Sequence, residues 1–234
     1  MGKAIVRHTG KVRFGHFTYV QELFFKNFWL CRFPRYLLSP NLSAKDAAKR
    51  IVWVDLEMTG LNIDTDYILE MACLVTDAHL NVIATGPDLI IHQPDDVLNN
   101  MNPWCIAQHG ESGLTEASRK SNISLTDAES KVLDFIKTHA PEKKCPLAGN
   151  SVYMDRLFLR KYMPNVDNYL HYRIIDVSTI KELGKRWFQK EFSNIPAKKF
   201  KHRSLDDIIE SIEELNRLCQ VQFVSVNSSH ALLK

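Results

Sequence analysis

Two carboxylates stand two positions apart in the stretch IVWVDLEMTG, residues 51–60, whose β-branched run otherwise predicts a buried strand. Side chains alternate between the faces of a strand, so Asp55 and Glu57 should point the same way. Two anions held this close repel each other unless a cation lies between them, and oxygen-only ligands favour Mg²⁺ or Mn²⁺. The simpler alternative is a strand that ends in water with both groups hydrated. The stretch alone supports the two interpretations about equally.

Three further residues have suitable chemistry. Asp155 follows the predicted strand CPLAGNS, and ligand sites of open α/β sheets gather where strands end. An acid near a helix N-terminus is also favoured by the helix dipole alone. His202 and Asp207 lie five apart in HRSLDDI. They would diverge by about 140° on one helix, so they converge only if His202 lies on a loop and Asp207 in the first turns. Alternatively, Ser204 and Asp207 form a helix-capping pattern and His202 is a surface residue.

The elements that must position these groups are predicted from periodicity and from turn residues. Strands are expected at 51–57, 68–77 and 80–93, in an antiparallel start. Helices and strands then alternate, with helices at 94–110 (broken at Pro103), 125–140, 152–163, 178–188 and 204–218 and strands at 145–151 and 172–178. Such an order predicts an α/β domain with one mixed sheet.

Charge divides the chain unevenly. The first 50 residues hold ten Lys or Arg and two acids, whereas the whole chain of 234 residues has a net charge of only +3. We define residues 1–48 as the leader; its basic, aromatic and acid-poor composition predicts a mitochondrial transit peptide, with a solvated basic tail as the alternative. Five scattered cysteines indicate neither a disulfide scaffold nor a zinc site. No apolar run has the length of about 20 residues that a membrane span needs.

Taken in order, the motifs are an Asp-x-Glu pair on the first strand, an Asp after a later strand and His-x₄-Asp at the last helix. This sequence resembles the DEDDh family of 3′→5′ exonucleases, whose motifs occur in that order. The stretches VWVDLEMTGL, EMACLVTD, CPLAGNS, KYMP, HYRIIDVSTIKEL and HRSLDDI extend the resemblance to the oligoribonuclease branch, over about residues 51–217.

The resemblance implies a ribonuclease H-like fold, with a five-stranded mixed sheet flanked by helices. It implies hydrolysis of short RNA oligonucleotides, especially dinucleotides, to 5′-mononucleotides by a homodimer with two Mg²⁺ or Mn²⁺ ions per active site. Asp55, Glu57, Asp155 and Asp207 would hold the metals, and His202 would be the general base. A mitochondrial location is expected, with the cytoplasm as a second possibility.

Further residues match the substrate contacts of the family. The resemblance implies that Leu61 wedges between two bases, that Trp104 stacks on a base and that His109 reaches the phosphate or sugar. It also implies that Ser151, Arg173 and Ser178 receive the 5′ phosphate, and that Tyr172 reaches the site from the partner subunit. Without the family, Leu61 and Trp104 would be taken as core residues and Arg173 as a surface charge.

The predicted exonuclease domain covers residues 49–217, and the tail at 218–234 departs from the family. Its sequence CQVQFVSVNSSHALLK alternates in hydrophobicity and predicts a strand or disorder instead of a continued helix. A proofreading-type DNA exonuclease and a catalytically silent nucleotide-binding isoform stay open as alternatives. The net acidity of residues 51–234 favours a substrate with few phosphates, because proteins that track long strands carry a basic stripe.

Overall fold

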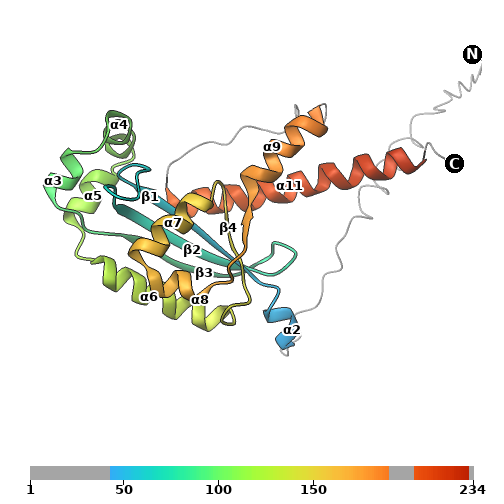
Figure 1. Cartoon of the computed structure of the whole chain (residues 1–234), viewed down its shortest axis with the longest axis horizontal. Helices are drawn as coiled ribbons and strands as arrows, with labels where there is room; N and C mark the ends of the chain where they lie inside the picture. Colours follow the sequence, from blue (N-terminus) through green and yellow to red (C-terminus); the bar gives the residue numbers. More distant parts are fainter. Residues whose placement is uncertain (1–42, 190–202, 232–234) are drawn as a thin grey trace, which may run out of the picture. The chain divides into compact units, whose positions relative to one another are not determined.

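A computed structural model describes residues 43–189 and 203–231, with side chains up to residue 219. These residues all belong to one compact unit, residues 42–234. Five strands form a single sheet in the order β3-β2-β1-β4-β5 (Figure 1). Their bounds are β1 Ile51–Met58, β2 Ile68–Thr76, β3 Val82–Ile90, β4 Leu147–Gly149 and β5 Ile174–Asp176. The first three pair antiparallel, while β4 pairs parallel with β1 and β5, which confirms the predicted mixed sheet.

Helices connect and cover the strands. The structure describes α2 Ala44–Ala47, α3 Asp95–Asn99, α4 Pro103–Glu111, α5 Leu114–Lys120, α6 Leu125–His139, α7 Tyr153–Tyr162, α8 Pro164–Tyr169, α9 Val177–Trp187 and α11 Ser204–Ala231. Side chains cap the starts of several helices, among them Asn102 at α4 and Ser124 at α6. The break at Pro103 is confirmed. The short helices α2, α5 and α8 were not predicted from periodicity, because segments of four to seven residues hold too few turns to show one.

The side chains of β1 divide between two hydrophobic clusters. Val52, Val54 and Leu56 pack on the face that α6, α7 and α8 cover. Ile51 and Trp53 pack on the other face with residues of α9 and α11. Because the period of a strand is two, Asp55 and Glu57 continue the second series toward α11. The two-sided core therefore fixes where the carboxylates point.

The final helix corrects one prediction. Helix α11 runs from Ser204 to Ala231, so residues 218–231 of the tail continue the helix and do not form the predicted strand or disordered segment. Once the first turns exist, each added residue forms one hydrogen bond without the cost of a new nucleus. The helix contains no Gly or Pro that would stop it. A local alternation of hydrophobic and polar residues favours a strand less strongly than this propagation favours the helix. Among the described residues, no helix is both long and apolar enough to cross a membrane.

Candidate active site

Three predicted metal ligands come together at one point. Asp55, Glu57 and Asp207 each offer a carboxylate oxygen, and these oxygens lie within 4.8 Å of one another. We call these three side chains the acidic cluster. Two of them come from β1 and the third from the first turn of α11, more than a hundred residues later in the chain. The convergence that the spacing of HRSLDDI left conditional is thus realised for Asp207.

Local structure explains the position of Asp207. Its backbone N–H donates to the carbonyl oxygen of Arg203 at 3.0 Å, which forms the first turn of α11. A carboxylate in this turn interacts favourably with the positive end of the helix dipole. The predicted cap by the Ser204 side chain is not formed: the buried Ser204 hydroxyl has no hydrogen-bond partner among the described residues.

The electrostatics of the acidic cluster call for a cation. Burial, reinforced by the negative charges of Asp207, Glu70 and Asp155, raises the pKa of Glu57 to about 8. In the protein alone, one proton therefore relieves the repulsion at neutral pH. A divalent cation could take its place, and an all-carboxylate donor set suits Mg²⁺ or Mn²⁺. The residues present thus fit the metal that the sequence predicts.

Asp155 lies close to the acidic cluster but is not one of its three members. It lies on α7, is buried, and its Oδ1 accepts the backbone N–H of Leu56 at 2.9 Å. Burial is the main cause that raises the pKa of Asp155. Because Leu56 stands between Asp55 and Glu57 in the chain, this bond fixes the backbone of β1 beside the acidic cluster. His202, the predicted general base, lies outside the described residues.

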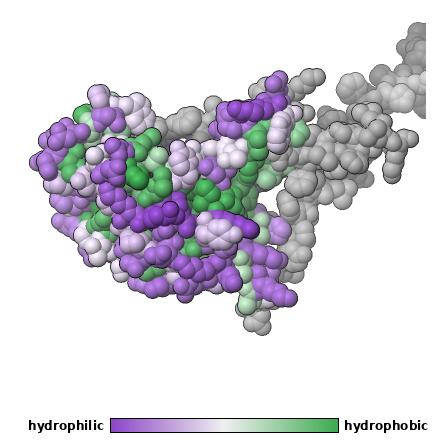
Figure 2. All heavy atoms as spheres, viewed as in Figure 1, coloured by the Kyte–Doolittle hydropathy of each residue, from purple (hydrophilic) through white to green (hydrophobic). Residues whose placement is uncertain are grey.

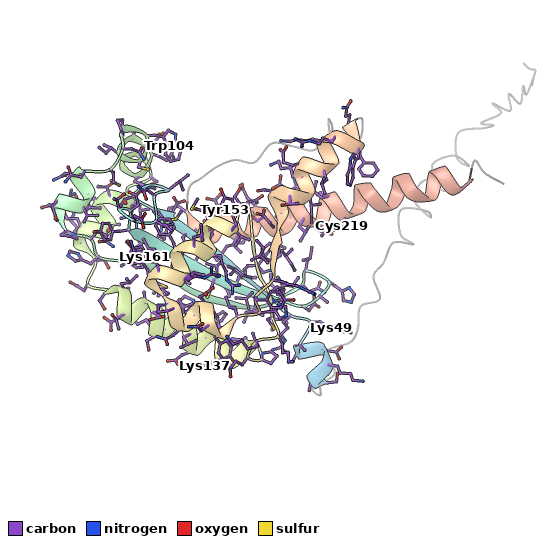
Figure 3. All side chains as sticks on the ribbon, viewed as in Figure 1. Lys49, Trp104, Lys137, Tyr153, Lys161 and Cys219 are labelled. Carbon is purple, nitrogen blue, oxygen red and sulfur yellow. The ribbon has the colours of Figure 1, made fainter. Side chains whose placement is uncertain are left out.

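The predicted base-contacting residues differ in exposure. Leu61 is 66% exposed and Trp104 63% exposed, so both are available for contact with a ligand and are not core residues. Trp104 projects from the start of α4 (Figure 3). His109, by contrast, is buried, and its Nε2 contacts the Met58 carbonyl at 2.9 Å. This bond joins α4, which carries Trp104, to the end of β1.

The loop that carries Leu61 is held from within. The Asp66 carboxylate accepts hydrogen bonds from the Thr59 hydroxyl at 2.9 Å and from the Asn62 backbone N–H at 2.8 Å. A Cβ at Gly60 would lie 2.4 Å from the same carboxylate, so only glycine allows this approach. Leu61 is therefore exposed on a loop in which the nearby residues Thr59 and Asn62 are both hydrogen-bonded to Asp66.

Two of the residues predicted to receive a phosphate lie together. The Ser151 backbone N–H donates to Ser178 Oγ at 2.9 Å and to Asp176 Oδ1 at 3.0 Å. Ser151 adopts a φ of 52°, in the left-handed region that few residues other than glycine occupy. Asn150 joins the group to α11, because its Oδ1 accepts the Ser178 hydroxyl and its Nδ2 donates to Ser211.

Tyr172 and Arg173 form a separate exposed pair before β5. Tyr172 is 74% exposed and stacks on His171 with 4.5 Å between ring centroids. The Arg173 guanidinium lies 5.4 Å from the centre of the Tyr172 ring. Both residues point to solvent in the single chain. Figure 2 shows hydrophobic patches between hydrophilic side chains on the face that it displays.

Sequence reasoning missed Glu70, Asn150 and Asp176. Glu70 occupies a strand in which every residue is buried, and a charge inside such a run is a signal that could have been read. Asn150 directly follows β4 and Asp176 ends its parallel neighbour β5, at the edge where ligand sites gather.

The raised pKa of Glu57 predicts a pH-dependent effect of metal on stability. Between the ordinary pKa and about 8, the folded protein binds one more proton than the unfolded chain, so this group lowers stability as pH rises. Below that value a cation must also displace the proton. We therefore expect Mg²⁺ to raise the melting temperature more at about pH 8 than at about pH 6. Thermal unfolding at both pH values measures this, and an equal shift would contradict it.

Comparison with known proteins agrees with this geometry. A sequence profile of the exonuclease family RNase_T matches residues 52–215. The mitochondrial oligoribonuclease of Homo sapiens is 56% identical over 173 residues, which cover 74% of this chain and 73% of that protein. The probable oligoribonuclease of Dictyostelium discoideum is 59% identical over 170 residues, covering 73% of this chain and 88% of that one.

Solved structures support the fold. Exonuclease I of Methylocaldum szegediense superposes with a TM-score of 0.56 at 18% identity, over 76% of this chain and 43% of that chain. The zinc-bound form of an E. coli ExoI–ssDNA complex gives a TM-score of 0.59 at 15% identity, over 79% of this chain and 44% of that chain. This chain thus spans less than half of either exonuclease, and at these identities the likeness concerns the fold alone. From the profile and the two relatives together, the chain belongs to the RNase_T exonuclease family and, within it, to the oligoribonucleases.

Proposed function

We propose that this protein is a 3′→5′ exoribonuclease that hydrolyses short oligoribonucleotides, down to dinucleotides, to 5′-mononucleotides. The observation that carries the proposal is the acidic cluster, formed at the predicted positions inside a domain of oligoribonuclease sequence. Relatives from Homo sapiens, Bos taurus and Mus musculus are named mitochondrial oligoribonucleases, which supports a mitochondrial location.

In the proposed mechanism Asp55, Glu57 and Asp207, with Asp155 beside them, would hold two Mg²⁺ or Mn²⁺ ions. When bound, such ions stabilise the charge that develops on the phosphate and on the leaving oxygen. His202 would accept a proton from the attacking water, since an imidazole titrates near neutral pH. Attack at phosphorus breaks the bond to the 3′-oxygen of the preceding nucleotide, which takes up a proton and leaves.

Two groups of side chains would restrict the enzyme to short substrates. Leu61 and Trp104 offer apolar surfaces for two adjacent bases, and stacking on an aromatic ring contributes about 1–3 kcal/mol per base. Ser151, Ser178 and Arg173 would receive the 5′ phosphate and leave no path for a longer strand. His109 would reach the phosphate or sugar, and its bond to the Met58 carbonyl joins α4 to β1.

Homodimer formation is part of the proposal, because the exposed Tyr172 would then reach the site of a second subunit. The predicted domain limits, with the leader at 1–48 and the exonuclease domain at 49–217, also stay a proposal. Residues 1–42 lie outside the described part of the chain, and α2 begins within the proposed leader at Ala44.

A cleavage assay on 5′-phosphorylated RNA of graded length tests the proposed function. With Mn²⁺ and the full chain, we expect the dinucleotide to be cleaved fastest and the rate to fall as length increases. The rate should also depend only weakly on salt, because few phosphates are contacted. Preference for long DNA strands would instead identify a proofreading-type nuclease, and binding without cleavage would identify a silent binding protein.

A further inference from the structure

Glu70 is a buried carboxylate that the proposed mechanism does not use. It lies on β2, is 0% exposed, and stands directly opposite Glu57 of β1 in the strand register. A buried charge is costly unless it is paired and hydrogen-bonded. Its partners therefore show what the carboxylate does in this fold.

Those partners come from the start of α11. Arg203 donates to Glu70 through Nε at 3.0 Å and through Nη2 at 2.7 Å, in a two-nitrogen contact with the carboxylate. The Ser204 backbone N–H also donates to Glu70, at 3.3 Å. This N–H belongs to the first turn of a helix, where backbone donors lack partners within the helix. Glu70 thus takes the place of a side-chain cap for α11, from a strand 133 residues earlier in the chain.

The same contact determines where a metal ligand stands. Arg203 has its side chain on Glu70, and its carbonyl oxygen accepts the Asp207 N–H. Arg203 is also the residue that directly follows His202 in the chain. A shift at Arg203 therefore moves the Asp207 carboxylate relative to Asp55 and Glu57, which are fixed on the sheet.

Other charges face this pair. Asp88 on β3 and Asp206 on α11 interact electrostatically with Arg203, and the positive charge of Arg203 opposes the rise in the pKa of Glu57. A test must therefore separate the position of Asp207 from the local charge. Removing Glu70 and Arg203 together does so, because the net charge does not change.

We infer that Glu70 is a positioning residue for catalysis, which holds Asp207 in the acidic cluster through Arg203 and Ser204. The inference rests on the proposed metal-dependent function. Neither Glu70 nor Arg203 contacts the metal or the RNA in this role. Outer partners that orient metal ligands typically contribute 10- to 100-fold to metal affinity or activity.

The test is the charge-neutral double variant Glu70→Gln with Arg203→Met. Gln can still accept the Ser204 N–H, and no buried charge is left unpaired, so folding should be preserved. We expect Mn²⁺ affinity by isothermal titration calorimetry to fall about tenfold, and kcat on a 5′-phosphorylated diribonucleotide to fall about tenfold or more. KM should change by less than about threefold, because the base contacts are untouched.

The matched control is Glu213→Gln with Arg217→Met, the same substitutions at an exposed ion pair of the same helix. We expect the control to keep both Mn²⁺ affinity and kcat. Retention of both by the Glu70 and Arg203 variant would overturn the inference. So would losses that match the unfolded fraction seen by circular dichroism at the assay temperature.

A milder variant tests the inference if the double variant does not fold, and the metal titration tests it if the wild-type protein does not cleave RNA. Arg203→Lys preserves the charge at a half-exposed position but offers one nitrogen in place of two, so an intermediate loss of kcat is expected. If the double variant fails to fold, an unchanged kcat in Arg203→Lys overturns the inference. If the wild-type protein binds Mn²⁺ but cleaves no RNA, the proposed function fails, while the comparison of Mn²⁺ affinities still tests the positioning role.

Discussion

Asp55→Asn is expected to abolish cleavage of a 5′-phosphorylated diribonucleotide, by a factor of about a thousand or more, while the protein stays folded. Asn has the same shape but lacks the negative charge that would balance a divalent cation. A loss of several kcal/mol of transition-state stabilisation corresponds to this factor. The side chain lies in a crowded acidic cluster, so its neutralisation should not lower the melting temperature in the absence of metal.

Three measurements separate this role from a structural one. Steady-state cleavage should show the loss in kcat, circular dichroism should show an unchanged fold, and Mg²⁺ should no longer raise the melting temperature. Asp134→Asn, an exposed carboxylate on α6, is the matched control and should behave as wild type. Near-normal activity in Asp55→Asn would contradict the assignment of the acidic cluster as the metal site.

Strand periodicity made half of this site predictable. A period of two is a strong rule, because one face of β1 packs on α6 to α8 and the other on α9 and α11. Asp55 and Glu57 therefore had to share a direction. Asp207 was harder to place, since its approach depends on the angle of α11 to the sheet. Only the resemblance to an exonuclease family, and not the spacing, indicated that it would join them.

Contacts between distant parts of the chain explain what the sequence did not predict. Nothing local to Glu70 reveals Arg203 as its partner, which lies 133 residues later in the chain. The contact of His109 with the Met58 carbonyl, 51 residues earlier in the chain, was likewise not indicated by the sequence, while its predicted contact with the phosphate or sugar stays a prediction. The prediction for the tail was wrong for the opposite reason. Local alternation of hydrophobic and polar residues predicted the end of the helix at a point where α11 continues.

These supporting contacts share one physical purpose. Asp155 holds the backbone of β1 beside the acidic cluster, Glu70 holds the start of α11, and Asp66 holds the Leu61 loop. Each uses a carboxylate to fix backbone N–H groups, which have few conformations to lose. A site that must place a phosphate within a fraction of an ångström gains more from a rigid backbone than from additional ligands.

Trp104→Ala is expected to raise KM for a diribonucleotide by about 10-fold, and by up to about 100-fold when combined with Leu61→Ala, with little change in kcat. Each side chain is mostly exposed in the free protein, so its truncation leaves no cavity and should not change stability. Stacking contributes equally to the bound substrate and to the transition state, so its loss is expected in KM.

A second exposed tryptophan supplies the control. Trp187 on α9 is 65% exposed, nearly the same fraction as Trp104 at 63%, and Trp187→Ala should leave KM unchanged. Binding of a non-hydrolysed dinucleotide analogue, followed by fluorescence, would report the same loss of affinity without turnover. An unchanged KM in Trp104→Ala would remove this residue from the substrate site. A fall in kcat alone would instead indicate that Trp104 acts indirectly, through His109 and the end of β1. Both residues lie on α4, and of the two it is His109 that contacts the Met58 carbonyl.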